Sequence, residues 1–303
     1  MFENIKLDLK NQKEISTPIQ RISRKKHINW LSNLAFSGLE KILHINKNIK
    51  ITESEFQSPI RSRFSNNDTG KIRHYHSAQD TNRAVVVLPQ RGGGYNFAQL
   101  IARYLASQGI ESYELITPLR ESRFPRGCGS LAELDLRISD LERTFNQAIT
   151  ETRGLICNID KEKIGICGIS LGAIYSSIAY GIDDRLNSAA LILAGGDLAG
   201  LIMNSEDKIA KAIRPNLYGL KEKELRIVLK GIEPCNHVNE EKTDNLLMIT
   251  AQFDKDVPEN YGNILKEAWG NPRTYSIKAG HVSVAKDIFR ILPMILEHYD
   301  RTL

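Results

Sequence analysis

The chain has 303 residues, of which 41% are hydrophobic and 25% are charged, and its formal net charge is +5. These values are those of an average soluble globular protein, and they exclude a disordered or collagen-like chain. The positive charge is spread along the chain without a long Lys/Arg tract interleaved with aromatic residues, so nucleic acid is not an expected partner.

Residues 1–47 are expected to form an N-terminal extension, a polar arm followed by an amphipathic helix at Leu31–Leu43. The start of the chain lacks the apolar core of a secretory signal, and no window reaches the roughly 18 apolar residues that span a bilayer. The basic cluster Arg21–Trp30 permits weak contact with an anionic membrane surface, although a solvated turn before a docking helix explains it better. Four cysteines without a C-x-x-C pair indicate reduced thiols in a cytoplasmic protein.

Residues 48–303 are expected to form one domain in which strands and helices alternate. After a hairpin at Asn48–Ile60 and Ile72–Ser77, strands are expected at Ala84–Pro89, Ile110–Pro118, Lys163–Gly168, Ala189–Gly196, Asn245–Ala251 and Arg273–His281. Helices are expected at Tyr95–Gly109, Ser130–Arg153, Ser170–Gly181 and Val284–Asp300, the last kinked or ended early by Pro293. This alternation predicts an α/β fold with a mostly parallel central sheet and helices on both faces. The polar, helix-forming stretch at about 197–243 predicts a small lid-like insertion.

Ser170 lies between two glycines in the sequence Gly-Ile-Ser-Leu-Gly, which runs from Gly168 to Gly172. The five letters alone are weak evidence, but here an expected strand precedes the serine and an expected helix follows it. A turn this tight needs small residues on both sides of the serine and exposes its hydroxyl. The backbone amide of Leu171, at the start of the helix, is a candidate donor to a developing oxyanion.

Over roughly residues 48–300 the sequence resembles the α/β-hydrolase family, whose nucleophile elbow matches this motif. The resemblance implies a catalytic triad in the chain order serine, acid, histidine. The acid is expected after a late strand, where "QFDKDVP" offers Asp254, with Asp256 and Asp197 as alternatives. The histidine is expected after the last strand, where "KAGHVS" offers His281. His281 would act as general base toward Ser170, and the acid would orient the imidazole.

The resemblance also implies a second oxyanion donor in the loop after the first long buried strand, which reads "LPQRGGGYNF". The backbone amides of Arg91 and Gly92 are the candidates. Pro89 and Gln90 stand where many family members have His-Gly, and this departure favours a non-catalytic binding protein. The glycine run matches neither a dinucleotide fingerprint nor a phosphate-binding loop, so no cofactor is expected.

Two further groups of side chains are weaker candidates for binding a substrate or a metal ion. Arg120, Arg123 and Arg126 follow a strand on the expected active-site side and are candidates for binding an anionic substrate group, the alternative being a solvated basic loop. His74 and His76 have an alternate-residue spacing that suits a metal ion. Because the sequence offers no evident third ligand, a surface strand is favoured and no metal is expected.

The combined pattern predicts a serine hydrolase that cleaves a carboxylic ester or thioester of a small molecule through an acyl-enzyme intermediate. The same triad serves peptidases and acyltransferases, since the acyl acceptor depends on the pocket and the lid. These enzymes, and a binding protein that has the fold without catalysis, remain the alternatives.

Overall fold

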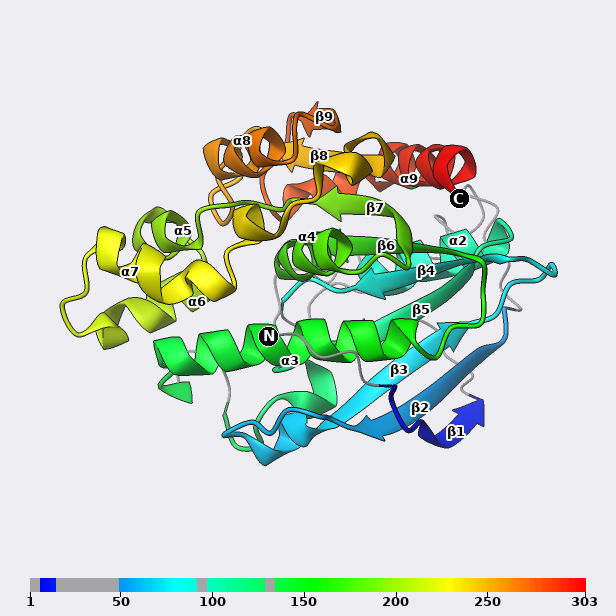
Figure 1. The fold of residues 1–303 in the computed structure, drawn as a ribbon, viewed down its shortest axis with the longest axis horizontal. Helices are drawn as coiled ribbons and strands as arrows, with labels where there is room; N and C mark the ends of the chain where they lie inside the picture. Colours follow the sequence, from blue (N-terminus) through cyan, green and yellow to red (C-terminus); the bar gives the residue numbers. More distant parts are fainter. Residues whose placement is uncertain (1–5, 15–48, 92–96, 129–133) are drawn as a thin grey trace.

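The computed structural model describes residues 6–14, 49–91, 97–128 and 134–303 (Figure 1). Within these ranges a nine-stranded sheet has the order β1-β2-β3-β5-β4-β6-β7-β8-β9. The strands are β1 (Lys10–Glu14), β2 (Ile51–Gln57), β3 (Thr69–Tyr75), β4 (Arg83–Leu88), β5 (Glu111–Ile116), β6 (Lys163–Ile169), β7 (Leu186–Ile192), β8 (Leu246–Ala251) and β9 (Arg273–Ile277). Strands β4 to β9 are parallel, and β1 to β3 add antiparallel pairs at one edge. The predicted mostly parallel sheet is confirmed.

Helices cover both faces of this sheet, which explains why its central strands β4, β6, β7 and β8 are buried almost throughout. The helices are α2 (Phe97–Ser107), α3 (Ile138–Ile156), α4 (Leu171–Ile182), α5 (Leu198–Asn204), α6 (Lys208–Ile213), α7 (Glu222–Val228), α8 (Glu259–Ala268) and α9 (Ile288–Thr302). Val86 of β4 shares a core with Phe145 of α3, whereas its neighbour Val87 shares the opposite core with Leu100 of α2 and Ile291 of α9. Alternate side chains of one strand therefore pack against different helical layers.

The N-terminal extension contributes a strand to the sheet. β1, which lies in the segment expected to be a polar arm, pairs antiparallel with β2. The expected helix at Leu31–Leu43 and the basic cluster Arg21–Trp30 lie outside the described residues. Among the described helices, none combines the length and the apolar character needed to cross a membrane.

The stretch between β7 and β8 is helical and contains α5, α6 and α7 (Figure 1). It packs closely against the segment that leads into α3: the Asn216 side-chain amide donates to the carbonyl oxygen of Leu136 at 3.0 Å. Ile213 and Leu225 of this stretch are buried in the same core as Leu136. This stretch, for which we keep the name insertion, thus packs against the segment that precedes α3.

Three helices differ from the expectation. α3 begins at Ile138, eight residues late, because Asp135 has a positive φ of 44° and the Asp140 carboxylate accepts the Arg137 amide at 3.0 Å, which fixes the first turn there. α9 continues through Pro293, so the early break was wrong. Pro293 is exposed, and water can hydrate the carbonyl that it leaves unpaired. α8 was not anticipated.

Candidate active site

Ser170 lies in a sharp turn between β6 and α4, with φ 53° and ψ −121°. Its backbone amide donates to the carbonyl of Ile192 on β7 at 2.7 Å, which ties the turn to the neighbouring strand. A Cβ at Gly172 would lie 2.3 Å from the backbone oxygen of Leu88, and one at Gly168 would lie 2.4 Å from that of Gly172. Both glycines are therefore required by close packing of backbone against backbone.

His281 contacts Ser170 through one ring nitrogen and an acid through the other. Its Nε2 lies 2.9 Å from the Oγ of Ser170, and its Nδ1 lies 2.7 Å from Oδ2 of Asp254. Because a carboxylate can only accept, Nδ1 carries the ring proton in the neutral imidazole and Nε2 is free to accept the serine proton. The three side chains form one hydrogen-bonded chain from the hydroxyl to the buried carboxylate.

The loops that carry the acid and the histidine are held by backbone hydrogen bonds. The amide of Phe253 donates to the carbonyl of Ala279 at 2.9 Å, so the two loops run side by side. The Oδ1 atom of Asp254 accepts the amides of Asp256 and Val257 at 2.9 and 2.8 Å. These bonds fix the carboxylate, whose residue is only 6% exposed, in the position that leaves Oδ2 for the imidazole.

The two alternative acids have different partners in the described structure. Asp197 caps α5 through the amide of Gly200 and forms an ion pair with Arg226 at 2.8 Å. Asp256 donates its backbone amide to Asp254 and acts on His281 through charge rather than through a hydrogen bond. Of the three candidates, Asp254 is the one whose carboxylate contacts the imidazole.

The surrounding charges determine the protonation of His281. Burial lowers the pKa of the imidazole, but the hydrogen bond and charge of Asp254, with smaller contributions from Asp256 and Asp207, outweigh burial and raise it above its ordinary value. Burial also raises the pKa of the Asp256 carboxyl. These acidic groups therefore favour the protonated, imidazolium form of His281.

This electrostatic arrangement predicts the acid limb of the pH profile. If His281 must be neutral to accept a proton, kcat/KM falls as pH drops through the raised pKa of the free enzyme's imidazole. In the variant Asp256→Asn the loss of a nearby negative charge lowers that pKa, so the limb moves to lower pH. Measuring kcat/KM for a neutral ester from pH 5 to 9 tests this. A limb that stays in place or moves upward contradicts the assignment.

Of the three candidate oxyanion donors, Leu171 and Arg91 lie within the described residues. The Leu171 amide lies in the first turn of α4, where it has no intrahelical acceptor. Gly92 lies in the range 92–96, outside the described residues. The Arg91 side chain forms an ion pair with Asp207, the N-cap of α6, at 2.6 Å. The insertion also reaches the acid loop, because the amide of Glu206 donates to the carbonyl of Lys255 at 2.9 Å.

The three arginines after β5 have different environments. Arg123 is fully buried and forms a two-pronged ion pair with Glu151 of α3, both bonds being 2.7 Å long. Its guanidinium also donates to the carbonyl of Ile116 at 2.8 Å. The prediction that Arg123 contacts an anionic substrate group is therefore wrong. Arg126 is exposed. Arg120 is 2% exposed and donates to the carbonyl of Gln90 at 2.6 Å.

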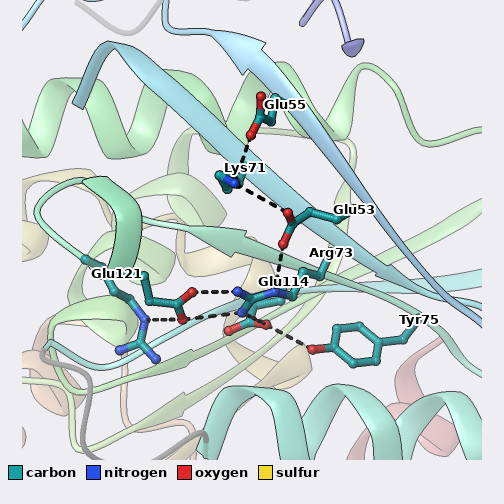
Figure 2. A network of polar contacts seen from close by, with 8 residues as sticks. Glu53, Glu55, Lys71, Arg73, Tyr75, Glu114 and Glu121 are labelled. Atoms are coloured by element: carbon teal, nitrogen blue, oxygen red, sulfur yellow. Dashed lines mark hydrogen bonds and ion pairs between the residues drawn. The ribbon is translucent and has the colours of Figure 1, made fainter. Parts of the chain in front are cut away.

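A buried network of charges spans β2, β3 and β5 (Figure 2). Arg120 joins it through Glu121, with Nε 3.7 Å from Oε1. At its centre the Arg73 guanidinium lies 3.2 Å from the fully buried Glu114 carboxylate and also pairs with Glu53 and Glu121. Burial raises the pKa of Glu114, although the charge of Arg73 opposes this. Through Arg120 the network reaches Gln90, so it holds the start of the glycine-rich loop. Sequence reasoning missed it because the partners meet only in the folded sheet.

A small pocket, partly open to solvent, is lined by Leu171, the residue that follows Ser170. Leu171 and Tyr175 of α4 form one wall, and Ile209 and Ile213 of the insertion helix α6 form another. The lining is mostly apolar, with the side chains of Arg91 and Arg120 among its polar members. The insertion therefore supplies part of the surface that a bound molecule would meet.

No family model matches the chain, and no curated protein matches it either. Solved structures do. The acylaminoacyl peptidase of Pyrococcus horikoshii aligns with a TM-score of 0.61 at 15% identity, over 87% of this chain and 43% of its own. The acetyl xylan esterase of Paenibacillus sp. R4 aligns with a TM-score of 0.61 at 13% identity, over 90% of this chain and 96% of its own. The Pyrococcus furiosus esterase Pf2001 aligns with a TM-score of 0.54 at 13% identity, over 87% and 95% of the two chains.

The shares of the matched chains differ. This chain spans less than half the length of the acylaminoacyl peptidase but nearly the whole length of the two esterases. At these identities the likeness concerns the arrangement of strands and helices. This likeness confirms the predicted fold.

Proposed function

We propose that this protein, which has the α/β-hydrolase fold, is a serine hydrolase that cleaves carboxylic esters or thioesters of small molecules. The observation that carries the proposal is the hydrogen-bonded chain from Ser170 through His281 to Asp254. A serine hydroxyl is a weak nucleophile unless an adjacent base accepts its proton, and the imidazole is placed to do so. The esterases among the solved structures of the same fold support the choice of ester substrates.

The reaction follows from these positions. The Oγ of Ser170 attacks the carbonyl carbon while its proton passes to Nε2 of His281, and the Asp254 carboxylate stabilises the resulting imidazolium. The Leu171 amide and an amide of the 91–92 segment would donate hydrogen bonds to the oxyanion. When the tetrahedral intermediate collapses, the alcohol or thiol leaves with the proton from His281. Water, activated by the same imidazole, then cleaves the acyl-enzyme and restores Ser170.

The test is covalent labelling with a fluorophosphonate, which phosphonylates an activated serine. The wild-type protein is expected to be labelled at one site, and peptide mass spectrometry is expected to assign the adduct to Ser170. The labelled protein should lose hydrolysis of a nitrophenyl ester in proportion. A protein that is neither labelled nor active would support a binding protein that has the fold without catalysis.

A substrate panel distinguishes an esterase from a peptidase and from an acyltransferase. Esters and thioesters of graded acyl length are compared with acylaminoacyl anilides, because the acylaminoacyl peptidase shares the fold. We expect the esters and thioesters to have the higher kcat/KM. A preference for the anilides would favour a peptidase, and transfer of the acyl group to an added alcohol in preference to water would favour an acyltransferase.

The pocket beside Leu171 is proposed to hold the apolar part of the substrate. In the variant Ile209→Trp the larger side chain fills part of this space, so kcat/KM for an octanoyl ester should fall by about tenfold or more while the acetyl ester is hardly affected. Each buried methylene contributes about 0.8 kcal/mol, or roughly fourfold. The matched control is Ile227→Trp, since Ile227 lies on the same insertion but is 70% exposed. Equal losses for both esters would contradict this use of the pocket.

A further inference from the structure

His74, His76 and Glu111 form a cluster at the antiparallel junction of β3 and β5. His74 and His76 are two residues apart, so their side chains lie on the same face of the sheet. The register pairs Tyr75 with Ser112, which places Glu111 across from His76. Nε2 of His74 is hydrogen-bonded to Oε1 of Glu111, and Nδ1 of His76 lies 3.9 Å from the same oxygen. One ligand atom from each residue lies within 4.8 Å of the other two.

Neighbouring groups orient these three side chains. Nε2 of His76 lies 3.0 Å from the Thr52 hydroxyl, and Nδ1 of the same ring faces Oε1 of Glu111. Lys161 lies 3.6 Å from the other carboxylate oxygen of Glu111 and also donates to the carbonyl of Thr81. The imidazole of His74 stacks on the Tyr113 ring with centroids 4.1 Å apart. Ligands whose second polar atom is bound elsewhere are typical of metal sites in proteins.

We propose that His74, His76 and Glu111 bind a divalent transition-metal ion of the Zn²⁺ type. Two imidazoles and one carboxylate are a common three-residue ligand set for zinc, with water in the fourth position. Ligand bonds of about 2.0 Å place tetrahedral ligand atoms roughly 3.3 Å apart. The three ligand atoms already lie within 4.8 Å of one another, so we expect side-chain rotation to bring them to that spacing. The metal would replace the hydrogen bond between His74 and Glu111.

The position of the cluster indicates that the ion would stabilise the fold rather than take part in hydrolysis. Glu111 is the first residue of β5, whereas Ser170 follows the last residue of β6, and both strands are parallel to β4. The cluster and the triad therefore lie at opposite ends of the parallel strands. A metal ion there would link β3 to β5, where the antiparallel and parallel parts of the sheet join.

The full chain, stripped of metal with a chelator, is titrated calorimetrically with Zn²⁺ at pH 7.5. We expect one bound ion with micromolar or tighter affinity and a rise of several degrees in the thermal unfolding midpoint. The variants His76→Ala and Glu111→Gln should each weaken binding by about tenfold or more. His237→Ala is the matched control, since this half-buried histidine of the insertion lies outside the cluster, and it should bind zinc as the wild type does.

A second measurement does not depend on the variants. Co²⁺ added to the wild-type protein should give the strong visible absorption of a four-coordinate ion, and Zn²⁺ should remove it. Hydrolysis of a nitrophenyl ester should be the same with and without the metal. A wild type that binds no zinc overturns the proposal. Zinc binding that survives both His76→Ala and Glu111→Gln, or that is lost in His237→Ala alone, also overturns it.

Discussion

Replacing Ser170 with alanine should reduce hydrolysis of a nitrophenyl ester by about 10⁶-fold and abolish fluorophosphonate labelling. The variant removes the proposed nucleophilic oxygen and leaves the proposed base and oxyanion donors in place. Alanine adopts the same backbone conformation at the same steric cost as serine, so the thermal unfolding midpoint should hardly change. Activity, labelling and thermal unfolding measured on the same preparation separate loss of chemistry from loss of structure.

The control for Ser170→Ala is Ser283→Ala, since Ser283 lies near His281 and bonds to the backbone of Gly280. That variant should keep both labelling and turnover at close to the wild-type level. Turnover at the wild-type rate in Ser170→Ala would contradict the proposed mechanism. Loss of activity in both variants would instead indicate a general disturbance of the histidine loop.

Replacing Asp254 with asparagine should lower kcat by about 10⁴-fold at pH 8. The asparagine amide can donate to Nδ1, which stabilises the tautomer with its proton on Nε2, and in that tautomer the imidazole cannot accept the proton of Ser170. The charge that stabilises the imidazolium is lost as well. Kinetics with a short nitrophenyl ester and circular dichroism of the variant provide the measurement.

The matched control here is Asp256→Asn, two residues away. Its carboxylate acts on His281 only through charge, so kcat at pH 8 should stay near the wild-type value. If Asp256→Asn inactivates the protein and Asp254→Asn does not, the acid has been assigned to the wrong residue. Asp197→Asn should leave catalysis intact, because Asp197 caps α5 and pairs with Arg226.

The sequence predicted the central part of the fold and the meeting of three distant side chains. Ser170, Asp254 and His281 each follow a parallel strand, and the carboxyl ends of parallel strands lie at one edge of the sheet. The resemblance to the α/β-hydrolase family supplied the order serine, acid, histidine, and the contact between His281 and Asp254 distinguished this acid from Asp256 and Asp197. The short apolar stretches of the sequence predicted the central strands. A short apolar stretch bounded by turn residues is typical of a strand that is covered on both faces.

The features that were missed depend on partners that local patterns do not reveal. Arg123 looked like a basic loop residue because Glu151, which neutralises it, lies in a helix 28 residues later. Glu111 lies 35 residues after His76 along the chain, so the alternate histidines offered no third ligand until the register of β3 and β5 was known. The ion pair of Arg91 with Asp207 joins two loops with no sequence pattern in common.

The backbone at Ser170 is in a region that residues with a side chain rarely adopt, at a cost of roughly 1 kcal/mol or more. Glycine would relieve that cost, and it would remove the hydroxyl. A chain selected for thermal stability alone would therefore carry glycine at position 170. Serine at this position lowers the free energy of unfolding relative to glycine, but it supplies the hydroxyl that is proposed to react. Stability and activity therefore favour different residues at position 170.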